Sequence, residues 1–332
     1  MRSPTLSELP AAPSGKTGWP WTIETAHEPR LPESQSSSPK ISIVLASLNQ
    51  GKYIEQNIRS VLLQGYPNVE YIIIDGESTD NSIEIIKKYG HWITYWASEH
   101  EHNGPGCKSA AEAYIEGFSR ATGDVFGITC ADDYYAQGAF VNLMRLRASQ
   151  PGTVIWAGSS HSVDLDDKFI VERPAFIKDL HFFGNWGDDA YFSTVATLMD
   201  AKAYRSVGGL DSGVGTSNDN ELFLRMAKYA KIALTSTVTA SARFNPLSLS
   251  NHDSTAHLAR MAGVSFMHGD HDVAKRILER YSRDNLMTKP IADILKLRTV
   301  QAFVNSIPPA VLVRALFRRV VASIRRRLKR RD

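Results

Sequence analysis

Three strongly apolar runs in the first half of the chain each end in polar or acidic residues. The runs are Ile41–Leu45, Tyr71–Ile74 and Val125–Thr129, and stretches with helical apolar spacing separate them. Alternating strand and helix patterns predict a parallel sheet with crossover helices. In such a sheet the carboxyl ends of the strands meet at one edge, where ligands bind. The sequence therefore predicts an α/β fold whose site lies at the tips that follow these runs.

The remaining pattern divides the chain. Crossover helices are expected at Tyr53–Gln64, Ser82–Tyr89 and Ser109–Ala121, and residues 40–250 are expected to form one domain. Short strand patterns such as Thr153–Ala157 should complete its sheet with less regular pairing. From about His257 the chain has only helical patterns, which predicts a helical extension over 251–308 and a separate helix over 309–332.

The N-terminal segment has a different composition. Residues 1–39 are rich in Pro, Ser and Glu and lack apolar periodicity, which predicts a mostly disordered leader. Trp19 and Trp21 are candidates for local docking on the domain, although nothing in the sequence requires it.

Composition and cysteine use limit the cellular location. The chain has 332 residues, 43% of them apolar, and no run of about 18 uncharged apolar residues that would span a membrane. No apolar secretory signal opens it. Its two cysteines, Cys107 and Cys130, have neither a disulfide pattern nor zinc-ligand spacing. We therefore expect the protein in the reducing cytoplasm.

Six motifs occur in an order that resembles the family 2 glycosyltransferases, which are inverting enzymes with the GT-A fold. The motifs are Ile41–Asn49, Asp75–Asp80, Gly117–Asp124, Ala131–Asp133, Gly208–Asp211 and Asp219–Arg225. The resemblance covers roughly residues 40–245. It implies a GT-A-type, Rossmann-like, mostly parallel sheet with flanking helices. It also implies a nucleotide-diphosphate sugar as the donor.

The resemblance implies donor contacts at the first two strand tips. Asp75 would accept hydrogen bonds from the nucleotide base, and Ala46 and Asn49 would line the same site. The alternative for Asp75 is a turn-forming residue before Gly76.

The loop Glu99–Glu112 departs most from the family pattern. Two glycines and a proline shape it, and Lys108 is a candidate for phosphate contact. His100 and His102 alternate with acids there, but their spacing fits no standard metal site, which favours a solvated loop.

Two adjacent acids follow the third run. Asp132 and Asp133 would repel each other unless they were solvated or neutralised, and Mg²⁺ typically binds one or two carboxylates plus phosphates. The resemblance implies that both acids hold Mg²⁺ or Mn²⁺ and that Asp132 contacts the donor. Cys130 stands where relatives often have Asp or Asn. The alternative is a solvated turn before Tyr134.

The resemblance implies that Asp219 is the general base. A carboxylate there would take the proton of the acceptor hydroxyl. Asn218 and Glu221 have the spacing of a capping box, so Glu221 is expected to be structural. In that case Asp219 also lies in a first helical turn, where the helix dipole favours any acid.

Two further features leave their roles open. Trp186, Asp188 and Asp189 lie in an aromatic loop that either stacks on an acceptor sugar or belongs to the core. Arg243 matches an arginine near the end of the family domain, and it either faces a phosphate or bridges to an acid.

The C-terminal segment is cationic and amphipathic. Residues 314–332 contain nine Arg or Lys and one Asp, so this segment carries a charge of +8. The whole chain carries +3, so the other residues sum to −5. One apolar stripe runs along Val313, Phe317, Val320, Ile324 and Leu328. Such a helix suits an anionic membrane surface. The alternative is a purely structural helix that packs on the domain. Nucleic acid is disfavoured because no recognition module accompanies the charge.

Together these features predict a metal-dependent, hexosyltransferase-like inverting enzyme, peripheral at the inner face of the cell membrane. It would extend a glycan or a lipid-linked acceptor in cell-surface polysaccharide synthesis. The chain lacks the Gln-x-x-Arg-Trp signature of processive synthases, which favours single-sugar addition. One rival is a nucleotidyltransferase, disfavoured because no Gly-rich triphosphate loop follows the first strand. The other is a sugar-nucleotide-binding or scaffold protein without turnover.

Overall fold

The computed structural model of the protein describes residues 3–26, 38–98, 109–178, 190–212, 218–228 and 230–245. All of them belong to the first of two compact units, Met1–His252 and Asp253–Asp332. The predictions for Lys108, for the loop around Trp186 and for residues 251–332 lie outside these ranges.

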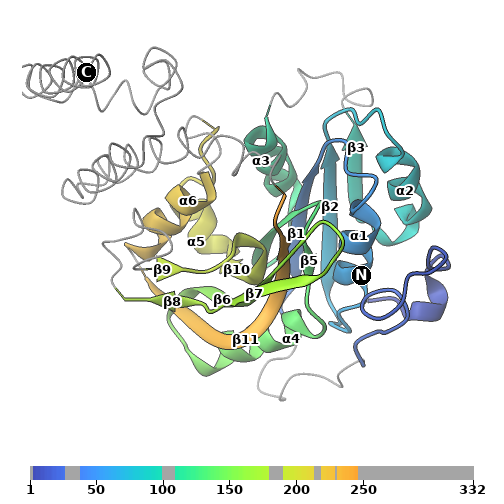
Figure 1. Ribbon diagram of the computed structural model, residues 1–332. Coiled ribbons are helices and arrows are strands. Elements are labelled where there is room, and N and C mark those ends of the chain that lie inside the picture. The colour runs from blue at the N-terminus through green and yellow to red at the C-terminus, as the bar shows by residue number, and fades with distance from the viewer. Residues whose placement is uncertain are drawn as a thin grey trace, which may run out of the picture. The chain divides into compact units, whose positions relative to one another are not determined.

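Strands and helices alternate through the first part of the chain, as the apolar pattern predicts (Figure 1). The strands are β1 (Ile41–Ser47), β2 (Val69–Asp75), β3 (Tyr95–Ser98), β4 (Val125–Cys130), β5 (Tyr134–Tyr135), β6 (Thr153–Val163), β7 (Phe169–Arg173), β8 (Phe176–Ile177), β9 (Ala190–Tyr191), β10 (Thr197–Asp200) and β11 (Lys231–Arg243). The α-helices are α1 (Ile54–Leu62), α2 (Ser82–Lys88), α3 (Ala110–Arg120), α4 (Ala139–Ser149), α5 (Ala201–Ser206) and α6 (Asn218–Ala227). Short 3₁₀ turns lie at η1 (Leu6–Glu8), η2 (Gly90–Trp92) and η5 (Thr194–Ala196). Within the described ranges, no helix has the length and apolarity needed to cross a membrane.

Nine strands form the main sheet, in the order β3-β2-β1-β4-β10-β6-β11-β5, with β7 paired to β6. Strands β3, β2, β1 and β4 are parallel, whereas β10 pairs antiparallel with both β4 and β6. The register places Ser47 opposite Asp75 and Ala46 opposite Cys130. The carboxyl ends of β1, β2 and β4 therefore meet at one edge, which confirms the predicted mostly parallel sheet with flanking helices.

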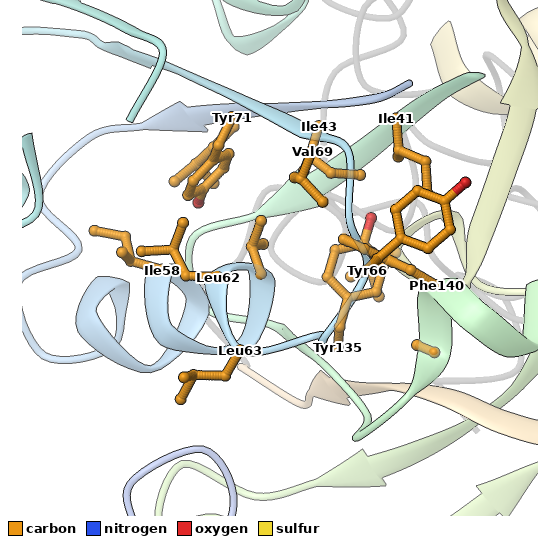
Figure 2. Packing of buried hydrophobic residues seen from close by; sticks show 14 of the residues in the cluster. Ile41, Ile43, Ile58, Leu62, Leu63, Tyr66, Val69, Tyr71, Tyr135 and Phe140 are labelled. Carbon is orange, nitrogen blue, oxygen red and sulfur yellow. The ribbon is translucent and has the colours of Figure 1, made fainter. Parts of the chain in front are cut away.

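Helices cover both faces of the parallel strands, so these strands are apolar on both sides. On one face, Ile58 and Leu62 of α1 point toward Ile43, Val69 and Tyr71 (Figure 2). Aromatic rings pack on the other face, where Phe126 lies 4.9 Å from Phe118 of α3 and 5.3 Å from Tyr204 of α5, measured between centroids.

The approach of α3 to the sheet depends on a glycine. A Cβ at Gly117 would lie 2.3 Å from Val44 Cγ1, so any larger residue would push the helix away from β1. One turn before Gly117, the Tyr114 hydroxyl donates to the Thr129 carbonyl near the end of β4 at 3.0 Å, so α3 also contacts a strand tip.

Residues 3–26 pack on the domain, which differs from the predicted mostly disordered leader. Leu9 and Trp21 are each 7% exposed, and the indole nitrogen of Trp19 donates to the carbonyl of Tyr135 at 2.7 Å. The anchor is Arg59 of α1, whose guanidinium donates to the carbonyls of Pro10, Pro20 and Trp21. A buried arginine needs acceptors. Carbonyls supply them here, and they leave no compositional signal in the leader.

Candidate active site

Hydrogen bonds join the loops that follow β1 and β2. The backbone N–H of Asn49 donates to Ser78 Oγ at 2.7 Å, and Asn49 Oδ1 accepts from the Thr79 N–H at 2.8 Å. The next two N–H groups, of Gln50 and Gly51, donate to Ser82 Oγ and Asp80 Oδ2. Asn49 has φ +53°, a left-handed conformation that Asn tolerates better than most residues. This pairing gives the two tips one fixed shape.

Asp75 lies at the end of β2 and is 1% exposed. Its two carboxylate oxygens accept from the N–H and the hydroxyl of Ser78, at 2.7 and 2.8 Å. Those contacts are what the turn-forming alternative requires. They also hold the carboxylate at the strand tip, near the end of β1. This geometry fits both a turn-forming residue and a contact to the nucleotide base, so the donor role of Asp75 stays a prediction.

The acidic turn after β4 is held from α1. The Asn57 amide donates to Thr129 Oγ1 at 2.7 Å and to the carbonyls of Cys130 and Asp133, while its oxygen accepts from the Tyr71 hydroxyl. Asn57 is fully buried, so these bonds are shielded from water. The turn closes with a bond from the Asp133 N–H to the Cys130 carbonyl.

Asp132 and Asp133 lie in an environment that disfavours their charged forms. Burial raises the pKa of both carboxyl groups, and the charge of Asp132 raises the pKa of Asp133 further. Among the described residues, no cationic side chain lies within ion-pair distance of either carboxylate. The charge of the nearby Arg243 lowers the pKa of both carboxyl groups, but by less than burial raises it.

The chemistry of this turn fits a hard divalent cation. Ligand atoms of Asp132, Asp133 and Cys130 all lie within 4.8 Å of one another. Two carboxylates suit a cation that takes its remaining ligands from water and phosphate oxygens. Burial raises the pKa of the Cys130 thiol well above its usual value, with further contributions from both neighbouring acids, so the thiol stays protonated. The carboxylates are therefore the expected ligands.

Asp219 belongs to the same electrostatic environment. It lies in the first turn of α6, and its Oδ2 accepts from the Thr194 hydroxyl at 2.5 Å. Asp132 and Asp219 both contribute to the raised pKa of Tyr114, after the larger effects of burial and Cys130. Asp132 and Asp219 therefore both act on Tyr114 and on Cys130, and the Tyr114 hydroxyl lies 3.7 Å from Cys130 Sγ.

Glu221 makes a different contact from Asp219. Its carboxylate forms an ion pair with Arg225, at 2.6 Å, and Arg225 also donates to the carbonyls of Val207 and Gly209. Glu221 is 5% exposed. These contacts connect α6 to the loop before it, which fits the expected structural role of Glu221. The ion pair is with Arg225, whereas the sequence predicted a capping box with Asn218.

Arg243, at the end of β11, lies behind the acidic turn. Its N–H donates to Asp133 Oδ1 at 2.7 Å, and its guanidinium donates to the Asp132 carbonyl and to Asp167. The guanidinium carbon lies 4.4 Å from the Tyr53 ring centroid. Of the two roles left open for Arg243, this structure has the bridge to an acid.

Two buried polar atoms within the described ranges have no hydrogen-bond partner, Ser47 Oγ and Arg243 Nε. Unsatisfied buried polar atoms are rare and call for an explanation, such as a ligand. Both residues lie at the ends of strands, beside Asp75 and beside the acidic turn respectively.

Sequence reasoning missed several residues that shape this site. Asn57 gave a usable signal, because it is a polar residue next to the apolar positions of a predicted helix. Tyr114, Thr194 and Asp167 gave none, since their partners lie far away in the sequence.

The sheet has helices on both faces, and its parallel strands end in paired loops and an acidic turn, as the GT-A resemblance implies. The glycosyl transferase family 2 profile matches residues 42–207. The chain belongs to this family.

Related proteins agree with that assignment. An uncharacterised glycosyltransferase of Rickettsia felis is 23% identical over 242 residues, and glycosyltransferase GlyG of Streptococcus pneumoniae is 31% identical over 130 residues. These matches cover 69% and 39% of this chain but only 38% and 42% of the relatives, so the chain spans about two-fifths of their length.

Solved structures show the same fold. The crystal structure of S. aureus TarS has a TM-score of 0.58 at 15% identity, covering 82% of this chain and 50% of TarS. A shorter form of TarS, residues 1–349 with UDP-GlcNAc, has a TM-score of 0.55 at 14% identity, covering 81% and 82%.

Proposed function

We propose that the protein transfers a sugar from a nucleotide-diphosphate sugar to an acceptor hydroxyl, with inversion at the anomeric carbon. The observation that carries this proposal is the acidic turn at Asp132 and Asp133. Its carboxyl groups have raised pKa values and lack a cationic side chain within ion-pair distance in the described part of the chain, and the predicted base Asp219 acts on the same neighbours. Membership of glycosyl transferase family 2 supports the same reaction class.

Asp219 serves as the general base in this proposal. Its carboxylate takes the proton of the acceptor hydroxyl while the acceptor oxygen forms a bond to the anomeric carbon. The bond from that carbon to the diphosphate oxygen breaks on the opposite face, and the electron pair leaves with the nucleoside diphosphate. Thr194, which donates to Asp219 Oδ2 at 2.5 Å, holds the carboxylate in position.

Asp132 and Asp133 hold Mg²⁺ or Mn²⁺ in this proposal. A bound divalent cation supplies positive charge that stabilises the diphosphate leaving group. Asn57 supports the turn from behind through the carbonyls of Cys130 and Asp133. Ala46, Asn49 and Asp75 line the nucleoside end of the donor site, and Lys108 contacts phosphate.

The experiment that tests the function is a donor screen with and without metal. Donors that include UDP-GlcNAc, the ligand in one TarS structure, are incubated with Mn²⁺ or with EDTA, and released nucleoside diphosphate is measured. The parent should release it only with Mn²⁺, and Asp132→Asn should be inactive while its melting temperature is no lower than that of the parent. Asp166→Asn, at an exposed acid, is the control. Release at the full rate in EDTA would reject the metal assignment, and donor binding without turnover would favour a non-catalytic binder.

We further propose that the acceptor is a glycan or a lipid-linked glycan of the cell surface, met at the cytoplasmic membrane face. The support is the sequence of residues 309–332, whose cationic and apolar stripes suit an anionic membrane.

A further inference from the structure

The turn between β6 and β7 is built to aim one acid at Arg243. Asp164 Oδ1 accepts from the N–H groups of Asp166 and Lys168, both at 2.9 Å, and the Asp164 N–H donates to the Lys168 carbonyl. These bonds lower the pKa of Asp164, so it remains charged. Asp167 has φ +66°, a conformation uncommon for a residue with a side chain. The turn holds it there.

Asp167 is connected to the acidic turn through a single side chain. Its Oδ1 pairs with Arg243 Nη2, and Arg243 Nη1 donates to the Asp132 carbonyl. The side chain of Arg243 is 1% exposed, whereas that of Asp167 is 28% exposed. Residues 76 positions apart in the chain therefore form one connection from the β6–β7 turn to the candidate metal ligands.

A buried guanidinium needs a negatively charged partner, and Asp167 supplies it. Arg243 also lies against the acidic turn, because its N–H donates to Asp133 Oδ1 at 2.7 Å and its guanidinium donates to the Asp132 carbonyl. Without Asp167, the acids on which the Arg243 charge acts would be Asp164, in the same turn, and the two carboxylates of the acidic turn. An ion pair there would compete with a divalent cation for the same oxygens.

We propose that Asp167 is a positioning residue, which holds the guanidinium of Arg243 away from the carboxylates of Asp132 and Asp133 and so keeps them available to the metal. This inference rests on the proposed function of the acidic turn. Asp167 would not touch donor or acceptor, and it acts only through Arg243. Loss of such a supporting partner typically weakens metal binding by about tenfold or more.

The test is Mn²⁺ binding to the full chain, followed by the electron paramagnetic resonance signal of free Mn²⁺. Asp167→Gly removes the side chain and keeps the left-handed backbone, which glycine adopts readily. Asp166→Gly is the matched control, because it adds a glycine and removes a carboxylate in the same turn. The Asp166 side chain is 73% exposed and lies 3.8 Å from Lys52.

We expect Asp167→Gly to raise the dissociation constant for Mn²⁺ about tenfold, with Asp166→Gly close to the parent. In an Arg243→Gln background, Asp167→Gly should cause no further change, because the competing cation is gone. For Asp167→Gly, the Mn²⁺ concentration that gives half-maximal donor turnover should rise by the same factor as the dissociation constant. The turnover rate at saturating Mn²⁺ should match that of the parent.

Equal Mn²⁺ affinity for Asp167→Gly and the parent would overturn the proposal, and so would equal weakening by the two glycine variants. A parent that binds no Mn²⁺ would overturn it as well. Mn²⁺ binding by a parent that never turns over a donor would instead reject the proposed function alone. If Asp167→Gly fails to fold, Asp167→Asn, which also tolerates positive φ, gives the same comparison against Asp166→Asn.

Discussion

Asp219 and Glu221 lie two residues apart on α6, and replacing each acid by its amide should separate chemistry from stability. Asp219→Asn keeps a side-chain oxygen for the Asn220 N–H, which donates to Asp219 Oδ1 at 2.8 Å, and a polar group beside Thr194. The stability cost should therefore be about 1 kcal/mol, the net worth of one hydrogen bond. Loss of a general base should lower transfer by about 10²–10⁴-fold. This corresponds to roughly 2.7–5.5 kcal/mol in the barrier.

Glu221→Gln should show the reverse pattern. Glu221 pairs with Arg225 at 2.6 Å, and its side chain is 6% exposed. Removal of its charge leaves a partly buried arginine with a weaker acceptor, which should cost about 2 kcal/mol of stability. Transfer by the folded protein should stay within about threefold of the parent, because no proton moves to Glu221 in the proposed reaction.

The assay measures the turnover number from nucleoside diphosphate release with saturating donor and Mn²⁺, well below each variant's melting temperature. Mn²⁺ and nucleotide binding are measured in parallel and should match the parent for both variants. If Asp219→Asn keeps its activity while folded Glu221→Gln loses it, Glu221 is the base and Asp219 only begins the helix.

Four further predictions follow from the same contacts. Asp133→Asn should stabilise the metal-free protein at pH 7 by about 1 kcal/mol, seen as a rise of a few degrees in melting temperature, because it replaces a carboxylate whose pKa burial raises; an unchanged or lower melting temperature would contradict this. The stability of the metal-free protein should fall as pH rises from about 4 through the raised pKa values of Asp132 and Asp133, because the folded state binds those protons more tightly than the unfolded state. The affinity for Mn²⁺ should rise over the same pH range. Titration calorimetry that finds no proton release on Mn²⁺ binding would contradict this pH dependence. Arg59→Met should destabilise the protein by about 3 kcal/mol or more, because it leaves three leader carbonyls without their buried donor, and protease should then cut residues 3–26 first; the control is Arg120→Met, which loses a more exposed pair. A chain ending at Pro309 should lose sedimentation with anionic vesicles at physiological salt, and equal sedimentation of both chains would remove the membrane proposal.

The regular part of the domain was predictable because its signals are local. Strands β1, β2 and β4 follow from uninterrupted apolar runs, and α1, α2 and α3 follow from apolar spacing, each within a few residues of the predicted bounds. The meeting of the strand tips then follows from parallel topology. Strand β6 is longer than its predicted core of Thr153–Ala157 because it continues into the hairpin with β7.

The parts that escaped prediction depend on contacts between distant residues. The leader is held by carbonyls that accept from Arg59, and carbonyls are present at every position of any sequence. The link from Asp167 to Arg243 requires the hairpin to return over the end of β11, which no local pattern encodes. The amide of Asn57 was visible as a polar residue in an amphipathic helix, but its target on β4 was not.

The central claim is that Asp132 and Asp133 hold the cation that binds the donor diphosphate. The most direct test is anomalous diffraction at the manganese edge from crystals grown with Mn²⁺ and a nucleoside diphosphate. The account predicts an anomalous peak for an Mn²⁺ ion that the Asp132 carboxylate coordinates. The diphosphate should lie against this ion, and the nucleobase should lie toward Asp75. An ordered nucleotide whose Mn²⁺ touches neither Asp132 nor Asp133 would contradict it.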